Sequence, residues 1–387
     1  MPINSIENAV RYTGELEKLF VQRSATGFFT DNAMRSKFVG AKTVLIPEVD
    51  FKGLADYDRD TGFTRGPVTV SNTSYTMSMD RGRSMQIDRE DLDESGVANL
   101  AGQILGEYVR TKVVPECDAY VISKLAGLAA TRGNTVNGEI TKPLAALNEL
   151  VQEVRNNVGY DEELVAFISG GVYAALTNSN EISRMITVSD FKQGEINLKM
   201  KSFDGVTLIP VVPERMYTAY TFLADGGFKP LDNARSTYML VCPKKAAHLV
   251  KKTEQMRIFT PEQNIDADAY KFDYRIYYDV FVTRSKLDSI WTWISPAVTV
   301  GTQPADAEGA GSTLTVAATA DNGGEISYQW YTASDADGNG ASKIAGATAG
   351  SYKVPSDLEE GIYYYFARIK VDGIIATDSK VATVTIV

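Results

Sequence analysis

Two kinds of hydrophobic periodicity divide the first part of the chain. Alternation of apolar and polar positions predicts three strands, at 43–47, 68–70 and 75–80. Together these segments predict a long two-stranded hairpin with little apolar surface. A lone hairpin is marginally stable in water. The hairpin therefore lies either on its own chain or on another subunit. After Asp88 the spacing becomes helical and continues to Leu128. Pro115 interrupts it, so we expect one long kinked helix or two collinear helices.

The middle of the chain combines helices with buried strands. A second amphipathic helix is expected from Leu144 to Val154, opened by Thr141 and Pro143, and a third runs through Leu176. Further strands are predicted at 164–168, 206–212, 220–224, 238–241 and 270–282. The last of these is unusually long, and we expect it to pack against the long helix. Residues 1–40 carry too little apolar surface to fold alone, although Ser5 is a candidate cap for a short helix reaching Phe20.

Composition changes at Pro296, where Thr, Ala, Gly, Ser and Tyr become frequent and short strands alternate with Gly/Asp turns. This pattern predicts an immunoglobulin-like sandwich. Trp330 is expected in its core and Tyr363 at its tyrosine corner. Tyr365 stands where disulfide-bonded domains have their second cysteine, and Val316 or Ala318 takes the first position, so we expect no disulfide. Exposed tyrosines that could contact sugars are Tyr331, Tyr352 and Tyr364, although packing on a strand face is the favoured explanation.

Charge and composition exclude several classes of protein. The net charge is −10, and residues 296–387 hold eleven acidic against five basic residues, a charge of −6. A nucleic-acid binder needs clustered Lys and Arg, although an acidic protein can still enclose DNA without gripping it. We expect no membrane span and, from the first residues, no secretory signal. Cys117 and Cys242 are interpreted as reduced, buried residues.

Candidate chemistry is sparse, and we expect no catalytic residues and no cofactor. His248 is the only histidine, and its basic amphipathic surroundings favour a structural role. A weak calcium candidate consists of Asp335, Asp337 and Asn339, which place oxygen ligands at alternate positions before a glycine. Gly346 occupies the twelfth position, where such loops carry a bidentate glutamate, so a simple turn is favoured.

The order of these elements, together with several local segments, resembles a tailed-phage major capsid protein of the Hong Kong 97 type. The matching segments are 41–47 (AKTVLIP), 53–57 (GLADY), 88–91 (DRED), 114–120 (VPECDAY), 266–270 (DADAY) and 274–282 (YRIYYDVFV). The resemblance implies an α+β capsid fold over residues 1–295, followed by the all-β sandwich. The expected parts are an N-terminal arm (1–40), an extended hairpin loop (41–90), a spine helix within the peripheral domain (91–135), an axial domain (136–245), a peripheral return strand (246–295) and the Ig-like domain (296–387).

The resemblance also implies a function. Such proteins assemble as hexamers and pentamers into an icosahedral or prolate shell that encloses double-stranded DNA, and the hairpin lies over a neighbouring subunit. Expected partners are further copies of the chain, a scaffolding protein, a portal and decoration proteins, with assembly in the host cytoplasm and a final place in the virion. Some relatives crosslink a loop lysine to an asparagine of another subunit, for which Lys52 and Asn233 or Asn264 are the candidates, although solvated surface residues are the favoured interpretation.

Two other functions stay open at this point. An encapsulin-type compartment would use the same fold, although its shells normally lack a terminal Ig-like module. A cell-surface adhesin or carbohydrate-binding protein would use the module itself, with a glycan or host-surface ligand. Particle size discriminates between them, because shells form megadalton particles and an adhesin forms a monomer or small oligomer.

Overall fold

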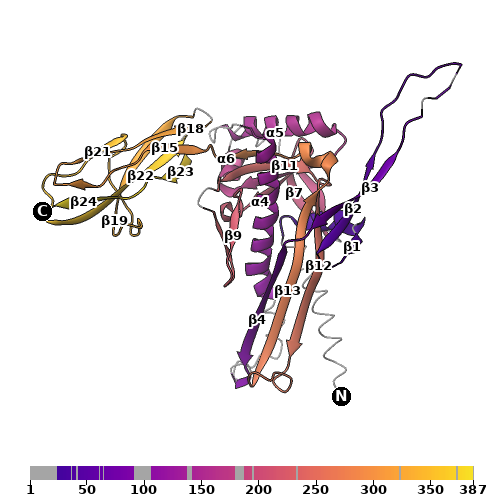
Figure 1. Cartoon of the computed structure of the whole chain (residues 1–387), viewed down its shortest axis with the longest axis horizontal. Helices are drawn as coiled ribbons and strands as arrows, with labels where there is room; N and C mark the ends of the chain where they lie inside the picture. Colours follow the sequence, from indigo (N-terminus) through magenta and orange to yellow (C-terminus); the bar gives the residue numbers. More distant parts are fainter. Residues whose placement is uncertain are drawn as a thin grey trace.

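The computed structural model describes residues 24–386 apart from 36, 41, 61, 64, 91–105, 137–141, 179–186, 194–195, 232–233, 322–323 and 372–373. The short helix expected between Ser5 and Phe20 lies outside these residues. The described part consists of a body (residues 24–295) and a C-terminal β-module (residues 298–386), which Figure 1 shows side by side. No helix in the described part is long and apolar enough to cross a membrane.

A six-stranded mixed sheet, in the order β14-β11-β5-β8-β7-β6, forms the centre of the body. Its strands are β5 (Leu164–Ser169), β6 (Thr187–Gln193), β7 (Ile196–Phe203), β8 (Val206–Val211), β11 (Thr237–Pro243) and β14 (Trp291–Ile294). The central strand β5 is buried along its full length because both of its faces are covered. Ala166 and Ile168 belong to the core under helices α5 (Pro143–Val158) and α6 (Gly170–Asn178), whereas Val165 and Phe167 belong to the core under the spine helix.

The spine helix is one helical run through residues 106–132 of the described part. It comprises a π-helical turn at Val109–Val113 (η2) followed by α4 (Val114–Arg132). In the π turn, the N–H of Val114 donates to the carbonyl of Val109, five residues earlier. Pro115 follows directly, and in a regular helix its ring would press on the carbonyl four residues before it. The wider turn relieves that clash, so the predicted kink takes the form of a π bulge and the helix continues.

A long three-stranded sheet in the order β12-β13-β4 runs beside the spine helix (Figure 1). Its strands are β4 (Met79–Asp88), β12 (Ala247–Phe259) and β13 (Ala269–Val282). The long strand predicted at 270–282 is confirmed as β13, and it packs against the spine as expected: the rings of Tyr120 and Tyr278 meet edge to face at 5.7 Å. Strand β12, by contrast, was not predicted.

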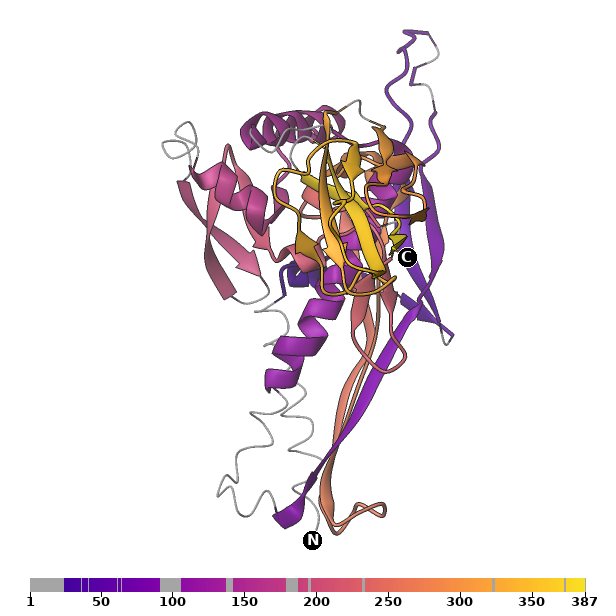
Figure 2. The same ribbon diagram turned by 90° about the vertical axis from the view of Figure 1, so that its left-hand side faces the viewer.

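The expected hairpin is confirmed as β2 (Thr43–Asp50) paired with β3 (Thr69–Thr76), with β1 (Lys37–Val39) on the outer side of β2. Its tip extends away from the body, as both views show (Figures 1 and 2). The prediction of one strand over 75–80 is wrong, because β3 ends at Thr76 and β4 starts at Met79 in a different sheet. The chain changes sheets there because the buried Met77 and the neighbouring Ser78 are both held by β13.

Short elements connect these layers in the body. They are η1 (Gly27–Arg35), η3 (Pro213–Arg215), β9 (Tyr220–Phe222), β10 (Phe228–Pro230) and η4 (Arg284–Ser289). Phe28 and Phe29 of η1 are buried against Phe167 of the central sheet, with ring centroids 6.1 Å away in each case; the Phe28 ring is stacked and the Phe29 ring is tilted. The first described turn of the chain is therefore part of the body's core.

The C-terminal β-module consists of short strands around a core that contains Trp330, which is fully buried as predicted. Its strands are β15 (Val298–Thr302), β16 (Ala307–Glu308), β17 (Thr313–Thr315), β18 (Ala317–Ala320), β19 (Ile326–Ala333), β20 (Ser342–Lys343), β21 (Ser351–Lys353), β22 (Gly361–Val371), β23 (Ile374–Asp378) and β24 (Ala382–Ile386). The larger sheet has the order β16-β24-β22-β19-β20, and β15-β18 and β17-β21 form two-stranded sheets.

Candidate assembly surface and the clusters that anchor it

The tip of the hairpin exposes large apolar side chains. Leu54 is fully exposed, Phe63 is 87 % exposed and Phe51 is 69 % exposed. The tip nevertheless has a defined shape, because Asp58 and Gly62 exchange two backbone hydrogen bonds of 2.8 and 3.3 Å. Gly62 has a φ of +80°, a conformation that favours glycine. Exposed apolar residues gathered on a preformed projection are typical of a protein–protein contact.

The root of the hairpin is fixed to the body by polar bonds. The Tyr75 hydroxyl donates to Glu48 at 3.1 Å, and it lies 3.2 Å from the carbonyl of Val282 at the end of β13. Glu48 also accepts the N–H of Arg284, at 3.2 Å. Burial, followed by the neighbouring Glu48 carboxylate, raises the pKa of Tyr75 to about 12. Below this root, Val44 and Ile46 share a core with Phe281, so the direction of the hairpin is set by the body.

Asp279 ties the hairpin root to the spine helix. This fully buried carboxylate on β13 accepts the backbone N–H of Ser78 at 2.9 Å and the Ser78 hydroxyl at 3.0 Å. From the spine it accepts the Tyr120 hydroxyl at 2.7 Å and the Lys124 ammonium at 2.5 Å. Buried charges are tolerated when they are paired and hydrogen-bonded in this way. One residue thus joins β13, the spine and the point where the chain passes from hairpin to long sheet.

Asp118 makes a second buried cluster on the spine helix and holds the first described residues of the chain. Its carboxylate accepts the Ser24 hydroxyl at 2.6 Å, the Thr26 hydroxyl at 2.8 Å, and the backbone N–H groups of Ala25 and Thr26 at 3.1 Å each. Arg215 of η3 lies 3.5 Å away. Burial raises the pKa of Asp118 above its ordinary value, although these donors act in the opposite direction. The cluster joins the arm, the spine and the loop after β8.

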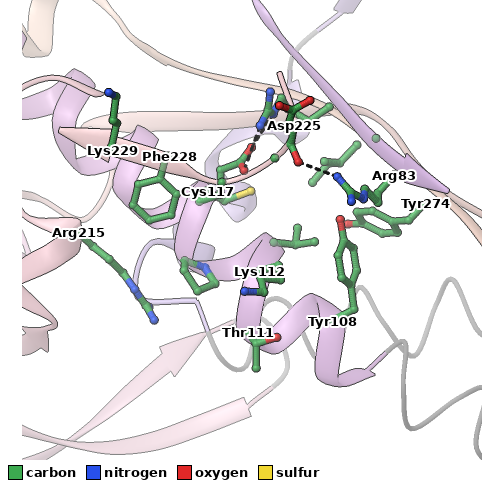
Figure 3. A pocket seen from close by; sticks show the side chains of 18 of the residues that line it. Arg83, Tyr108, Thr111, Lys112, Cys117, Arg215, Asp225, Phe228, Lys229 and Tyr274 are labelled. Carbon is green, nitrogen blue, oxygen red and sulfur yellow. Dashed lines mark hydrogen bonds and ion pairs between the residues drawn. The ribbon is translucent and has the colours of Figure 1, made fainter. Parts of the chain in front are cut away.

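A cleft of about 1160 Å³ lies beside η2 and the first turn of α4, between β4 and the β9–β10 hairpin (Figure 3). Its lining mixes cations and carboxylates, among them Lys112, Arg215, Lys229, Asp80, Glu214 and Asp225. Arg81 pairs with Glu116 at 2.7 Å and donates to the carbonyl of Leu223 at 3.1 Å. Arg83 donates to the carbonyl of Asp225 at 2.7 Å, so both arginines are used to hold the tip of the β9–β10 hairpin.

The lone histidine of the sequence and its two cysteines all lie in structural surroundings. His248 is half-buried on β12, and its Nδ1 lies 2.8 Å from the carbonyl of Asn32, which is a structural contact. Cys117 and Cys242 are free and buried, as interpreted from the sequence. Burial raises the pKa of the Cys242 thiol to about 12 and that of Cys117 well above its ordinary range, so both stay protonated. A protonated, buried thiol is a poor nucleophile.

The crosslink candidates are separated within one chain. Lys52 is on the hairpin tip, whereas Asn264 is in the turn between β12 and β13, and Figure 1 shows these segments at opposite ends of the body. Asn264 donates to the carbonyl of Ala269 at 2.9 Å. Asn233 lies outside the described residues. A crosslink stays a prediction that would need two subunits.

The calcium candidate is organised as a hydrogen-bonded turn. Asp335 accepts the backbone N–H groups of Asp337 and Asn339, at 3.0 Å each, and the Asn339 side-chain amide at 2.8 Å. These bonds, that of Asn339 first, lower the pKa of Asp335. Within the described residues, no three His, Cys, Asp or Glu side chains gather in a way that suits a metal ion. Calcium binding by Asp335, Asp337 and Asn339 stays an untested prediction.

The module's predicted core residues are where the sequence placed them. The Tyr363 hydroxyl donates to the carbonyl of Glu359 at 3.1 Å, which is the bond expected of a tyrosine corner. Tyr365 and Val316 are buried. Tyr352, expected among the exposed tyrosines, instead packs between Tyr365 and Trp330, with ring centroids 5.5 and 5.7 Å away. Apolar packing therefore fills the space that a disulfide occupies in related sandwiches.

Comparison with known proteins gives structural matches. No protein-family model matches the sequence, and no curated protein matches it. A structure from Mycobacterium phage Che8 matches 65 % of this chain and 84 % of its own at 10 % identity, with a TM-score of 0.43. The capsid of cyanophage P-SCSP1u matches 67 % of this chain and 84 % of its own at 13 % identity, with a TM-score of 0.46. The mature capsid of bacteriophage PhiM1 matches 66 % and 82 % at 13 % identity, with a TM-score of 0.42. At 10–13 % identity and TM-scores below 0.5 these matches are similarities only, and the fold described above rests on the topology of this chain.

Proposed function

We propose that this chain is a major capsid protein that assembles as hexamers and pentamers into a closed shell around double-stranded phage DNA. The observation that carries this proposal is the hairpin tip, where Leu54, Phe63 and Phe51 are exposed on a preformed projection. Burying a leucine or phenylalanine side chain is worth about 1.5–3 kcal/mol. A single chain leaves these side chains in water and does not gain this free energy. In a shell, each copy would gain it by burying its tip against a neighbouring subunit.

The fold is divided in this proposal as the sequence suggested. Residues 1–40 form the arm, 41–90 the extended loop, 91–135 the spine, 136–245 the axial domain and 246–295 the peripheral return strand. The axial domain would point to the centre of each capsomer, and the hairpin would lie over the adjacent subunit. A scaffolding protein, a portal and decoration proteins are the further partners, with assembly in the host cytoplasm.

The tip supplies a direct test of self-assembly. The double variant Leu54→Ser, Phe63→Ser removes apolar surface without touching the root, and Ile362→Ser is the matched control because Ile362 is a 59 % exposed apolar residue on the β-module. Sedimentation and electron microscopy should show megadalton shells for the native protein and the control, and folded small species for the double variant. Shells at native yield in the double variant would contradict the role of the tip.

The same particles test the alternatives. If the native protein forms only a monomer or small oligomer, the capsid proposal fails and an adhesin is favoured. If it forms shells, particles isolated from an infected host should hold nuclease-protected DNA; protein cargo without DNA would instead support an encapsulin-type compartment.

We propose further that residues 296–387 form an Ig-like domain that projects from the outer surface of the shell and binds glycans or the host envelope weakly. Its tyrosine corner and buried Trp330 support the Ig-like assignment. Its charge of −6 disfavours a place beside packaged DNA. Many copies on one shell would raise weak binding by avidity. Shells with and without this segment should differ in retention on immobilised mucin, and a module that protease and antibody cannot reach on intact shells would refute the outward position.

A further inference from the structure

The connection between the body and the β-module is very short. Strand β14 of the body ends at Ile294 and strand β15 of the module begins at Val298. Proline at position 296 restricts the backbone further, because its ring fixes φ. A link of this length does not by itself fix an angle between two bodies, so the contacts around it decide whether the module swings.

The residues on each side of Pro296 are bonded to different bodies. On the body side, Ser295 and Ser236 exchange two hydrogen bonds: the Ser295 N–H donates to the Ser236 carbonyl at 2.7 Å, and the Ser236 N–H donates to the Ser295 hydroxyl at 3.0 Å. On the module side, Ala297 and Asp321 exchange two more, of 2.8 Å to the Asp321 carboxylate and 3.0 Å to the Ala297 carbonyl. Each end of the link is therefore fixed within its own body.

Arg235 bridges the two sides. Its Nε donates to the carbonyl of Ser295 at 2.5 Å, and its Nη1 lies 3.4 Å from the same Asp321 carboxylate that accepts Ala297. The main chain of Arg235 is held in turn by Thr218, through bonds of 2.9 Å in both directions. Because the guanidinium is planar and rigid, bonds from two of its nitrogens fix both partners in one orientation.

We propose that Arg235 and Asp321 form a clamp that holds the β-module at one fixed angle to the body. Without it, the module could rotate about the backbone bonds next to Pro296, since the two bonded pairs on either side do not connect with each other. The clamp joins the body to the module of the same chain. The module is then a rigid projection whose orientation relative to the body is fixed. The clamp belongs to the single chain and does not depend on the capsid function.

Distances between two spin labels measure this angle directly. Asn148 on α5 and Asp357 in the module are exposed, and replacing each by cysteine gives a labelling pair across the junction. The native thiols do not compete, since Cys117 is 1 % and Cys242 0 % exposed. The full chain is used, with Arg235→Ala to remove both bridging bonds and Asp321→Asn to remove the charge while keeping an oxygen for Ala297. Arg132→Ala is the control because it removes an exposed ion pair with Asp288 inside the body, at 2.5 Å.

The labelled native chain and the Arg132→Ala chain should each give one narrow distance distribution. Arg235→Ala and Asp321→Asn should both lose it and give a broad one, with circular dichroism unchanged. Since the side chains of Arg235 and Asp321 are 31 % and 47 % exposed, salt should weaken the bridge; about 1 M NaCl, which screens charges beyond about 3 Å, should broaden the native distribution. A broad native distribution, or a narrow one in either variant, overturns the clamp.

Discussion

Replacing Asp118 by alanine should release the first described residues of the chain from the spine helix. Asp118 is fully buried and accepts four hydrogen bonds from Ser24, Ala25 and Thr26, with Arg215 close by. Alanine leaves the Ala25 N–H without its acceptor and leaves the Thr26 N–H with the Ser24 hydroxyl alone, at 3.2 Å. Removing one partner from a buried charged cluster costs about 3–5 kcal/mol. We expect that loss in the free energy of unfolding.

Two further variants serve as comparisons: one breaks an exposed ion pair, and the other removes the Asp118 charge while keeping an acceptor oxygen. Asp288→Ala removes an exposed ion pair with Arg132, so it should cost less than about 1 kcal/mol. Asp118→Asn keeps one acceptor oxygen and should lose less than the alanine variant. Burial raises the pKa of Asp118, so the folded protein takes up this proton at a higher pH than the unfolded chain does. The part of the stability that comes from this proton is therefore greatest in acid and is lost as the pH rises through the raised pKa, so all variants are compared at one fixed pH.

Urea unfolding measures the free energies of unfolding, and hydrogen exchange shows which segment of the chain loses its structure. In Asp118→Ala, the amides of Ala25 and Thr26 should lose protection while those of β5, at the centre of the body, keep theirs. An Asp118→Ala stability within about 0.5 kcal/mol of Asp288→Ala would refute the reasoning. Unchanged protection of Ala25 and Thr26 would do so independently.

Three further outcomes are expected. Tyr75→Phe should lose less stability between pH 10 and pH 12 than the native chain does. A pKa raised from 10.0 to about 12 gives a contribution to stability that is present below pH 10 and lost toward pH 12. The urea midpoints of the native chain and the variant should therefore lie closer together at pH 12 than at pH 10, and an equal difference at both pH values would contradict this. Millimolar calcium or a chelator should leave the melting temperature of the β-module unchanged, because Asp335 is already bonded to Asp337 and Asn339; a rise with calcium would contradict this. A chain ending at Pro296 should still form shells in the electron microscope, since β14 completes the body sheet; aggregation would mean that the module is needed for assembly.

In the strands that were predicted correctly, the order of apolar and polar residues follows directly from which faces of the strand are buried. Strand β5 is a continuous apolar run because two different cores cover its faces. The first half of β13 shows alternation, with Phe272, Tyr274 and Ile276 in the core shared with the spine, and its second half is buried on both faces. The hairpin was predicted from the alternation at 43–47 and 68–70, and β2 pairs with β3 over both segments; its dependence on a neighbouring subunit stays a prediction.

Strand β12 could not be predicted because its interior is partly polar. Lys251 and Glu254 are each only 8 % exposed and pair at 2.9 Å, and Glu254 also accepts the Tyr274 hydroxyl at 3.0 Å. A sequence with buried charges shows no simple alternation, so the stretch around His248 was interpreted as a basic amphipathic segment. Its strand conformation comes from pairing with β13 along nearly its whole length, which is tertiary information.

Asp118 and Asp279 are each marked in the sequence by a charge at a core position. Each carboxylate stands at a position that the local periodicity assigns to the core: Asp118 is next to Cys117 in the helical pattern, and Asp279 interrupts the apolar run of β13. A charge at such a position needs partners from elsewhere, and here each carboxylate is bonded to a segment from a distant part of the sequence. Asp118 holds the arm and Asp279 holds the hairpin root, both against the spine. The sequence could indicate that these segments need support, but the partners come from distant parts of the chain, and only the folded topology brings them together.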